Sequence, residues 1–240
     1  MSSTSEVGHN KNVANFGKAY QILEEMGTLY NPSNPNILLP NLAPKEIDLA
    51  ATMKVLNKQA PIYKNAVADR EVEIAPLGKL ATRSFNFSNS TNISAKDKEN
   101  LLSQVKKIRG DVKTKIINPE TSESDAISTS QMSYDSRIAN LDTFISQQAS
   151  HPEYIPNEDD LKIATLQTYH ERLSKLSEIV NQSGFALITG RKNRDIILYN
   201  GNSNVIQLIR EIKSYLKSLG AAGLPYYKAL VKLKFRDIER

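Results

Sequence analysis

Apolar residues recur along this chain at spacings of three and four residues, which is the period of one face of an α-helix. The first stripe consists of Val13, Phe16, Tyr20 and Leu23, and a second consists of Ile138, Leu141 and Ile145. We expect the first helix to end near Gly27 and the second near the His151–Pro152 step. Proline ends a helix because it has no N–H donor and restrains the residue before it.

A longer apolar pattern follows each of these helices, after a short connection that contains Tyr-x-Pro. In the second half of the chain the pattern has heptad spacing and weakens at Gly184; its positions are Leu166, Tyr169, Leu173, Leu176, Val180 and Leu187. The matching positions of the first half are Leu42, Leu49, Met53, Leu56, Ala60, Tyr63 and Val67. Heptad seams predict two long helices that bury one face, although Pro61 predicts a kink or break in the first of them.

Shorter elements follow both long helices. Apolar spacing predicts a helix from about Ser94 to Arg109 and another from Val205 to Leu219, whereas the Ser- and Asn-rich residues 83–93 predict a loop. After Gly220 to Gly223, apolar residues alternate with Lys and Arg near the C-terminus. This alternation favours either a short edge strand or an extended tail laid on the helices.

The two halves of the chain repeat each other. Residues 3–16 and 128–141 share five identities, and each copy opens on Ser-Thr-Ser, which predicts a helix N-cap. Tyr30-x-Pro32 and Arg70 also recur, as Tyr154-x-Pro156 and Arg194. We therefore predict a first helical repeat over residues 1–117, an acidic linker over 118–127, and a second helical repeat over 128–240 that ends in a basic tail.

These patterns predict the fold class, because strand signals are otherwise scarce. The chain is expected to be all-α, an elongated helical bundle formed by internal duplication of a long helical hairpin, with pseudo-twofold symmetry. Its 240 residues contain no Cys and no Trp, which excludes disulfides and thiolate metal sites.

Charge is distributed unevenly along the chain. The net charge is +5, and basic residues are concentrated in residues 205–240 and 96–115. Acidic residues gather instead at Glu120, Glu123 and Asp125, and again at Glu153, Glu158, Asp159 and Asp160. These segments are either ordinary solvated faces or a basic end that meets an acidic partner, a membrane surface or another copy of the chain.

The sequence lacks the common signatures of catalysis and cofactor binding. It contains no HExxH pair, EF-hand loop, phosphate-binding GxxxxGK[ST] loop, GxGxxG or GxSxG motif. His9, His151 and His170 share no metal-ligand spacing, so each is expected to be a surface or boundary residue. We therefore expect no enzyme activity, no cofactor and no metal.

Several polar residues are candidates for interaction. The basic candidates are Arg70, Arg194, Lys228, Lys232, Lys234 and Arg236. The two repeated arginines could bind a carboxylate or phosphate, or form surface salt bridges. The basic tail could contact phosphates or pack against the helices, but no nucleic-acid module surrounds it. Asn15 and Asn140 are either register-fixing polar groups or boundary residues.

Four phrases of the sequence carry a family resemblance. They are STS-x-x-x-H-x-K-N-V-A-N-F, the Tyr-Asn-Pro connection, STSQMSYDSRIANL and the closing LKFR. Together they resemble an uncharacterised helical protein family of Bacteroidetes bacteria. The resemblance implies a bacterial source and a helical fold, and it transfers no functional residues.

The expected function is that of a non-enzymatic structural or interaction protein. It would associate with itself, as a homo-oligomer or filament, or with another protein, through helical faces and oppositely charged ends. One alternative is a soluble helical toxin or effector that acts at membranes, and a further one is a small-ligand-binding bundle with polar groups facing inward. The chain has no membrane-length apolar stretch and opens on no secretory leader. We therefore expect it in the cytoplasm, with export by a signal-independent route as the alternative.

Overall fold

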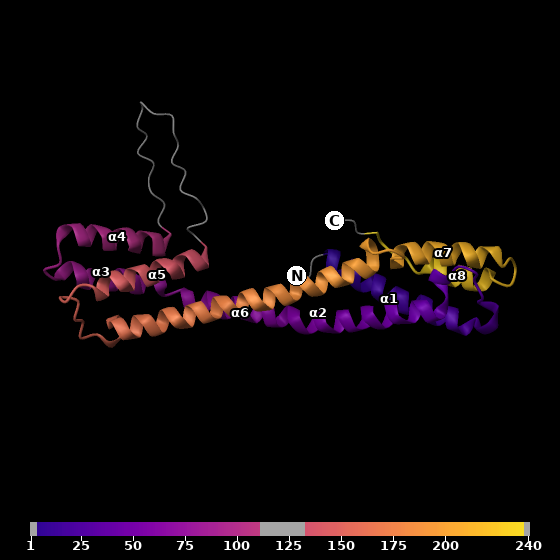
Figure 1. Cartoon of the computed structure of the whole chain (residues 1–240), viewed down its shortest axis with the longest axis horizontal. Helices are drawn as coiled ribbons and strands as arrows, with labels where there is room; N and C mark the ends of the chain where they lie inside the picture. The colour runs from indigo at the N-terminus through magenta and orange to yellow at the C-terminus, as the bar shows by residue number, and fades with distance from the viewer. Residues whose placement is uncertain (1–3, 111–132, 238–240) are drawn as a thin grey trace, which may run out of the picture. The chain divides into compact units, whose positions relative to one another are not determined.

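The regular structure of this chain is helical. A computed structural model describes residues 4–110 and 133–237, and within these residues it is all-α, as expected (Figure 1). The α-helices are α1 (Thr4–Glu25), α2 (Leu39–Ile74), α3 (Leu77–Ser90), α4 (Ala95–Arg109), α5 (Tyr134–Ala149), α6 (Ile163–Asp195), α7 (Val205–Ser218) and α8 (Leu224–Lys232). Short 3-10 turns, η2 (Pro35–Ile37) and η4 (Asp159–Leu161), precede the two long helices, and a π-helical turn, η5 (Ile196–Asn200), follows α6.

The chain folds into two compact units that do not follow its two halves. Unit 1 combines Met1–Ile62 with Gly184–Arg240, whereas unit 2 is the continuous segment Tyr63–Ser183. Each of the long helices α2 and α6 therefore contributes to both units. The predicted linker over 118–127 lies outside the described residues.

Unit 1 is built on the face of α1 that the first apolar stripe predicted. Phe16 and Leu23 are almost fully buried in its core, and Val13 and Tyr20 pack against them. The other side of this core comes from α7, whose buried residues are Val205, Ile206, Leu208, Ile209, Ile212 and Leu216. Helix α8 packs on both α1 and α7.

Unit 2 has a comparable core. Ile138, Leu141 and Ile145 of α5 are buried, as the second stripe predicted. Helix α4 packs against both α3 and α5, and it buries Leu101, Val105 and Ile108. The first heptads of α6 complete the core with Leu166, Tyr169 and Leu173.

The long helices pack against each other inside each unit. In unit 1, the backbone of Gly190 approaches Leu56 so closely that a Cβ at residue 190 would lie 2.8 Å from Leu56 Cδ2. In unit 2, Tyr169 donates a hydrogen bond to the Glu73 carbonyl at 2.6 Å. Of the kink or break predicted at Pro61, the break is wrong, because α2 continues as one helix through Pro61, with buried Leu56 and Ala66 on either side.

One other local expectation is also corrected. Helix α5 begins at Tyr134, where Ser133 accepts the Ser136 N–H at 3.1 Å and caps the helix; the Ser-Thr-Ser cap expected at 128–130 lies outside the described residues. Most of the loop expected over residues 83–93 belongs to α3, which ends at Ser90. The helix expected near Ser94 is confirmed, since Ser94 caps α4 at Asp97 N.

The C-terminal segment is partly helical and partly extended. Helix α8 reaches Lys232, so the edge-strand interpretation fails at Val231. Residues 233–237 then form an extended tail laid on unit 1, which confirms the other interpretation.

Candidate interaction site

The N-terminal half of α1 presents an unusually polar buried face in unit 1. His9, Asn12 and Asn15 recur every three residues, so they lie along one side of the helix. Their exposed fractions are only 1%, 0% and 7%. Buried polar side chains need hydrogen-bond partners, and these three find them in two segments near the C-terminal end of the chain.

The first of these segments is the π-helical turn after α6, which carries Tyr199. The Tyr199 hydroxyl lies 2.8 Å from His9 Nδ1 and accepts a hydrogen bond from Asn12 Nδ2 at 2.9 Å. Burial raises the pKa of Tyr199, and the Asn12 hydrogen bond opposes that rise. The prediction that His9 is a surface or boundary residue is therefore wrong, because η5 covers the first turns of α1.

The second segment is the extended tail. Asn12 binds the main chain of Arg236 in both directions: Nδ2 donates to the Arg236 carbonyl at 2.7 Å, and Oδ1 accepts the Arg236 N–H at 3.0 Å. One helical turn further along, Asn15 Nδ2 donates to the Lys234 carbonyl at 2.9 Å. Of the two interpretations of Asn15, a register-fixing polar group therefore fits better than a boundary residue, whereas Asn140 is half-buried.

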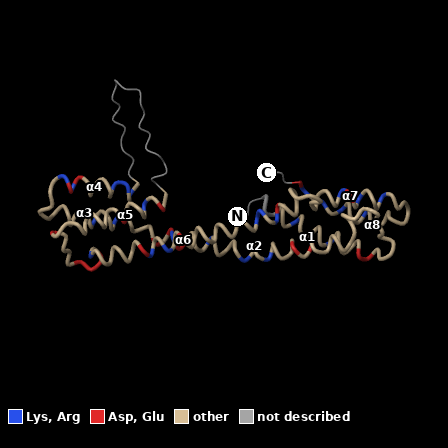
Figure 2. The backbone as a smooth tube through the Cα atoms, in the orientation of Figure 1, with Lys and Arg blue, Asp and Glu red and all other residues tan. Residues whose placement is uncertain are grey.

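The side chains of the tail alternate between the core and solvent. Leu233 and Phe235 pack on the core of unit 1, while Lys234 and Arg236 are exposed. From α7, Arg210 Nη2 binds Asp237 Oδ2 at 3.0 Å, and Lys213 Nζ lies 6.0 Å from the Phe235 ring centroid. Figure 2 shows basic residues along α7, beside the tail. Asn12, Asn15, Arg210 and Lys213 hold the tail, and we refer to these four residues together as the tail groove.

The other candidate basic residues have different environments. Lys228 and Lys232 of α8 are exposed. Arg194 is fully buried in unit 1, where its Nε donates to Asp195 Oδ1 at 2.9 Å, so a surface salt bridge is the wrong interpretation for it. In unit 2, Arg70 lies 4.6 Å over the Tyr134 ring and donates to Ser177 Oγ at 3.2 Å. A role for either arginine in anion binding remains a prediction.

Unit 2 contains a buried polar cluster that the sequence did not reveal. Gln148 of α5 donates to Ser84 Oγ at 2.8 Å and to Ser88 Oγ at 3.1 Å on α3. Ser84 Oγ also lies 2.7 Å from the hydroxyl of Tyr154, which donates to the Leu161 carbonyl at 2.8 Å. Ser84 Oγ also lies 2.9 Å from Gln148 Oε1, so its one proton has two acceptors within reach, the Gln148 carbonyl oxygen and the Tyr154 hydroxyl. The cluster is therefore a network of hydrogen bonds that joins α5, α3 and η4.

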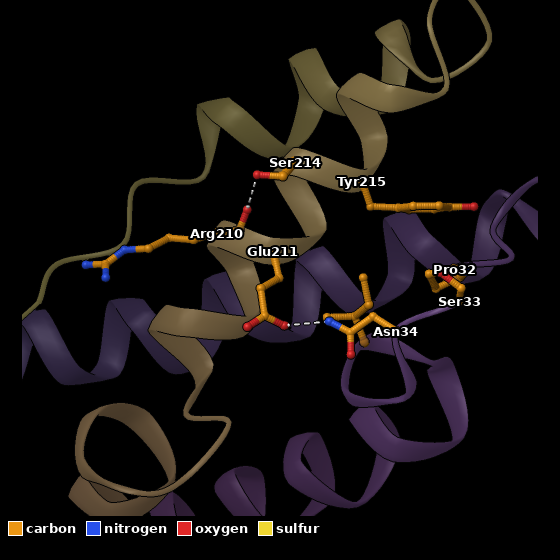
Figure 3. A pocket seen from close by; sticks show the side chains of 8 residues that line it. Pro32, Ser33, Asn34, Arg210, Glu211, Ser214 and Tyr215 are labelled. Carbon is orange, nitrogen blue, oxygen red and sulfur yellow. Dashed lines mark hydrogen bonds between the residues drawn. The ribbon is translucent and has the colours of Figure 1, made fainter.

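Two open surface pockets complete the description. The pocket in unit 1, with a volume of about 370 Å³, lies between the 32–37 segment and α7 (Figure 3). Inside it Asn34 Nδ2 donates to Glu211 Oε2 at 2.9 Å. A second pocket, of about 740 Å³ in unit 2, is lined by the basic residues Lys79, Arg83, Arg109 and Arg137. Arg83 already pairs with Asp160, and Arg137 Nε donates to the Ile108 carbonyl at 2.8 Å.

Metal and membrane features were also searched. Within residues 4–110 and 133–237, no group of three or more His, Asp or Glu side chains is arranged to hold a metal ion. In the same residues, no helix is long and apolar enough to cross a bilayer.

Comparison with known proteins adds no assignment. No protein-family model, curated protein or solved structure matches the chain. The resemblance to a Bacteroidetes family therefore remains a prediction.

Proposed function

We propose that this protein is a non-enzymatic interaction protein that associates with a second copy of itself through the outward faces of its long helices. The proposal rests on one observation, the apolar side chains that these faces leave in water. In unit 1 the exposed apolar residues of α2 are Ile47, Val55 and Ile62, and those of α6 are Phe185 and Ile188. Scattered apolar residues are normal on surfaces, but these recur on two packed helices.

The helical positions explain why the chain itself leaves these residues uncovered. Leu49 and Leu56 mark the buried seam of α2, while Val55 and Ile62, seven residues apart, lie on a different face of the helix. On α6, Phe185 is 75% exposed and Ile188 63% exposed, although Leu187 between them is buried. Burying one large apolar side chain contributes about 1.5–3 kcal/mol, so a second copy that covers several of them gains enough to associate.

The experiment compares Phe185→Glu and Ile188→Glu with Ala186→Glu, an exposed control position between them. Analytical ultracentrifugation over a concentration series would measure the dissociation constant of the dimer. We expect Phe185→Glu and Ile188→Glu each to raise this dissociation constant about ten-fold or more, because about 1.4 kcal/mol corresponds to a factor of ten. The control should change it little. A wild-type chain that stays monomeric at the highest concentration would contradict the proposal.

Charge is the second part of the proposal. Net positive charge in residues 205–240 and the acidic residues near 158–160 would let unlike surfaces of two copies attract each other. Two of these acids already have local partners, Asp159 with Lys162 and Asp160 with Arg83. The Lys162 ammonium lowers the pKa of Asp159. We therefore expect added salt to weaken association less than the roughly ten-fold loss of affinity expected for Phe185→Glu and Ile188→Glu.

We also propose that the fold arose by duplication of one helical hairpin. Matching contacts in the two units support this. Tyr30 donates to the Ile37 carbonyl at 2.6 Å, and Tyr154 donates to the Leu161 carbonyl at 2.8 Å, seven residues on in both cases. Each of these tyrosines also meets an aromatic ring edge-on, at 5.4 Å for Tyr215 and 5.2 Å for Phe87. The pseudo-twofold relation between the repeats remains a prediction.

A small-ligand-binding bundle is the alternative that would use inward-facing polar groups. The cluster of Ser84, Gln148 and Tyr154 has such groups, but they bond to one another and to the backbone. The same is true of Asn12 and Tyr199 in unit 1. These contacts favour a role in fixing helix packing over a role in binding a ligand.

A further inference from the structure

The C-terminal tail of this chain is bound in the way that proteins bind extended peptides. A single asparagine amide, Asn12, donates to the carbonyl and accepts from the N–H of the same residue, Arg236. Such a two-way contact is available only to a main chain whose N–H and C=O point to the same side, as in an extended strand. Asn15 makes only the donor half of such a contact two residues earlier, at the Lys234 carbonyl.

The side chains in the tail groove add selectivity to this main-chain recognition. Phe235 points toward the core of unit 1, within 6.0 Å of Lys213 Nζ. Two residues later, Asp237 meets Arg210. The groove therefore selects an extended segment with an aromatic residue followed, two positions on, by a carboxylate. Lys234 and Arg236 point to solvent, so their side chains are not part of the selection.

The attachment of the tail allows it to leave the groove without unfolding a helix. Helix α8 ends at Lys232, and Leu233 has an extended backbone (φ −78°, ψ 100°). The ion pair between Arg210 and Asp237 is solvent-exposed, with 71% of the Arg210 side chain and 41% of the Asp237 side chain accessible. Segments held by few buried contacts open locally far more often than a protein unfolds.

Loss of the tail would uncover part of the core of unit 1. Leu233 and Phe235 pack against that core, and their removal would expose apolar surface to water. Asn12 would keep its hydrogen bond to Tyr199 and exchange its Arg236 partners for water, so the burial of apolar surface favours refilling of the groove by another extended chain. The segment that matches every contact is the same segment of a second copy.

We propose that the tail groove is a peptide-binding site and that residues 233–237 of one copy can be replaced in it by residues 233–237 of a second copy. This interaction uses a surface distinct from the apolar faces of α2 and α6 and does not depend on them. It links copies by exchange of their tails.

The first test measures binding of a fluorescein-labelled peptide of residues 232–237, Lys-Leu-Lys-Phe-Arg-Asp, to the full chain. Arg236→Pro in the protein removes the N–H that Asn12 accepts, and it leaves the groove residues intact. When the native tail occupies the site, the apparent affinity for an added peptide is reduced, because only the fraction of molecules with an open site can bind it. We therefore expect the Arg236→Pro protein to bind the peptide about ten-fold or more tightly than wild type does.

Two controls keep this measurement specific. A peptide with the same Arg236→Pro change should not bind, because it lacks the N–H donor. If circular dichroism shows that the proline variant misfolds, Asp237→Ala provides a milder change that weakens the attachment of the native tail. Equal binding of the normal and proline peptides, or no binding to either loosened protein, would overturn the peptide-site proposal.

The second test asks whether the occupant comes from another copy. The chain has no Cys, so single cysteines report single positions. Full chains with Asn15→Cys and with Lys234→Cys, one of them carrying a size tag, are mixed and treated with a short bis-maleimide. A cross-linked heterodimer of these two chains supports tail exchange. As a control, Asn15→Cys is paired with Lys96→Cys, an exposed position on α4, and this pair should give no cross-linked heterodimer. Peptide binding without this cross-link would overturn exchange and assign the groove to peptides of other proteins.

Discussion

The contribution of the Tyr154 hydrogen bonds to stability can be measured with Tyr30 as an internal control. Both hydroxyls donate to a carbonyl seven residues on, and both rings meet another aromatic ring edge-on. Of the two, Tyr154 also shares a hydrogen bond with a buried serine, Ser84, at 2.7 Å. Substitution of each tyrosine by Phe keeps the ring contact and removes the hydroxyl, so the difference between the variants isolates the Ser84 contact.

The expected magnitudes follow from the number of bonds lost. Tyr30→Phe loses one neutral hydrogen bond, which contributes about 0.5–1.5 kcal/mol to stability. Tyr154→Phe loses two and should lower the free energy of unfolding by about 1–3 kcal/mol. For a chain of this size, 1 kcal/mol corresponds to about 2–4 °C in Tm.

The assay must report each unit separately, because Tyr30 belongs to unit 1 and Tyr154 to unit 2. Hydrogen exchange measured by mass spectrometry on α1 and on α5 provides this, together with urea unfolding followed by circular dichroism. A double-mutant cycle with Ser84→Ala should give a coupling of about 0.5–1.5 kcal/mol with Tyr154→Phe. If Tyr154→Phe costs no more than Tyr30→Phe, or if the cycle shows no coupling, a stabilising hydrogen bond between Ser84 and Tyr154 is refuted.

Three further predictions concern pH, glycine geometry and helix capping. Burial raises the pKa of Tyr169 to about 12, above its ordinary value of 10.0. The folded state therefore holds the Tyr169 proton more tightly than the unfolded state does. The resulting contribution to the free energy of unfolding is complete below pH 10 and should disappear as the pH rises to 12. In thermal melts between pH 9 and 12, Tm should therefore decline less for Tyr169→Phe than for wild type. Gly223→Ala should lower Tm sharply because its Cβ would lie 2.2 Å from the Leu216 carbonyl oxygen, whereas Gly220→Ala meets open space and bears only the strain of a φ of +63°, about 1 kcal/mol; similar Tm values for the two variants would contradict this. Ser94→Ala removes the cap of α4 and should lower the free energy of unfolding, measured in urea, by about 0.5–2 kcal/mol. Ser94→Asp keeps a capping oxygen and should largely avoid this loss.

The helices of this fold could be predicted where burial imposes a period on the sequence. Phe16, Leu23, Leu141 and Ile145 were identified correctly because each repeats every three or four residues on a helix that buries one face. Both ends of α4 were also predictable, because Ser94 is a local signal for an N-cap and Gly110 is a local signal for a left-handed turn at the C-terminus.

The polar interior could not be predicted in the same way. Ser84 and Ser88 have low helix propensity and indicate a loop locally, but their partner, Gln148, lies 60 or more residues away and stabilises them within α3. His9 was placed at the surface because nothing near it in sequence shows that Tyr199 covers it. Only the spacing of Asn12 and Asn15 beside the apolar stripe gave a local signal for the tail groove.

The order of the two units along the chain has a consequence for biosynthesis. Every residue of unit 2 is synthesised before residues 184–240, so α1 and the first part of α2 must wait longer for α7, α8 and the tail. Until then the apolar face of α1, including Phe16 and Leu23, has no partner and is open to chaperones, proteases and other nascent chains. Loss of even the last few dozen residues would therefore damage the unit that contains the first residues of the protein, and would leave the middle of the chain folded.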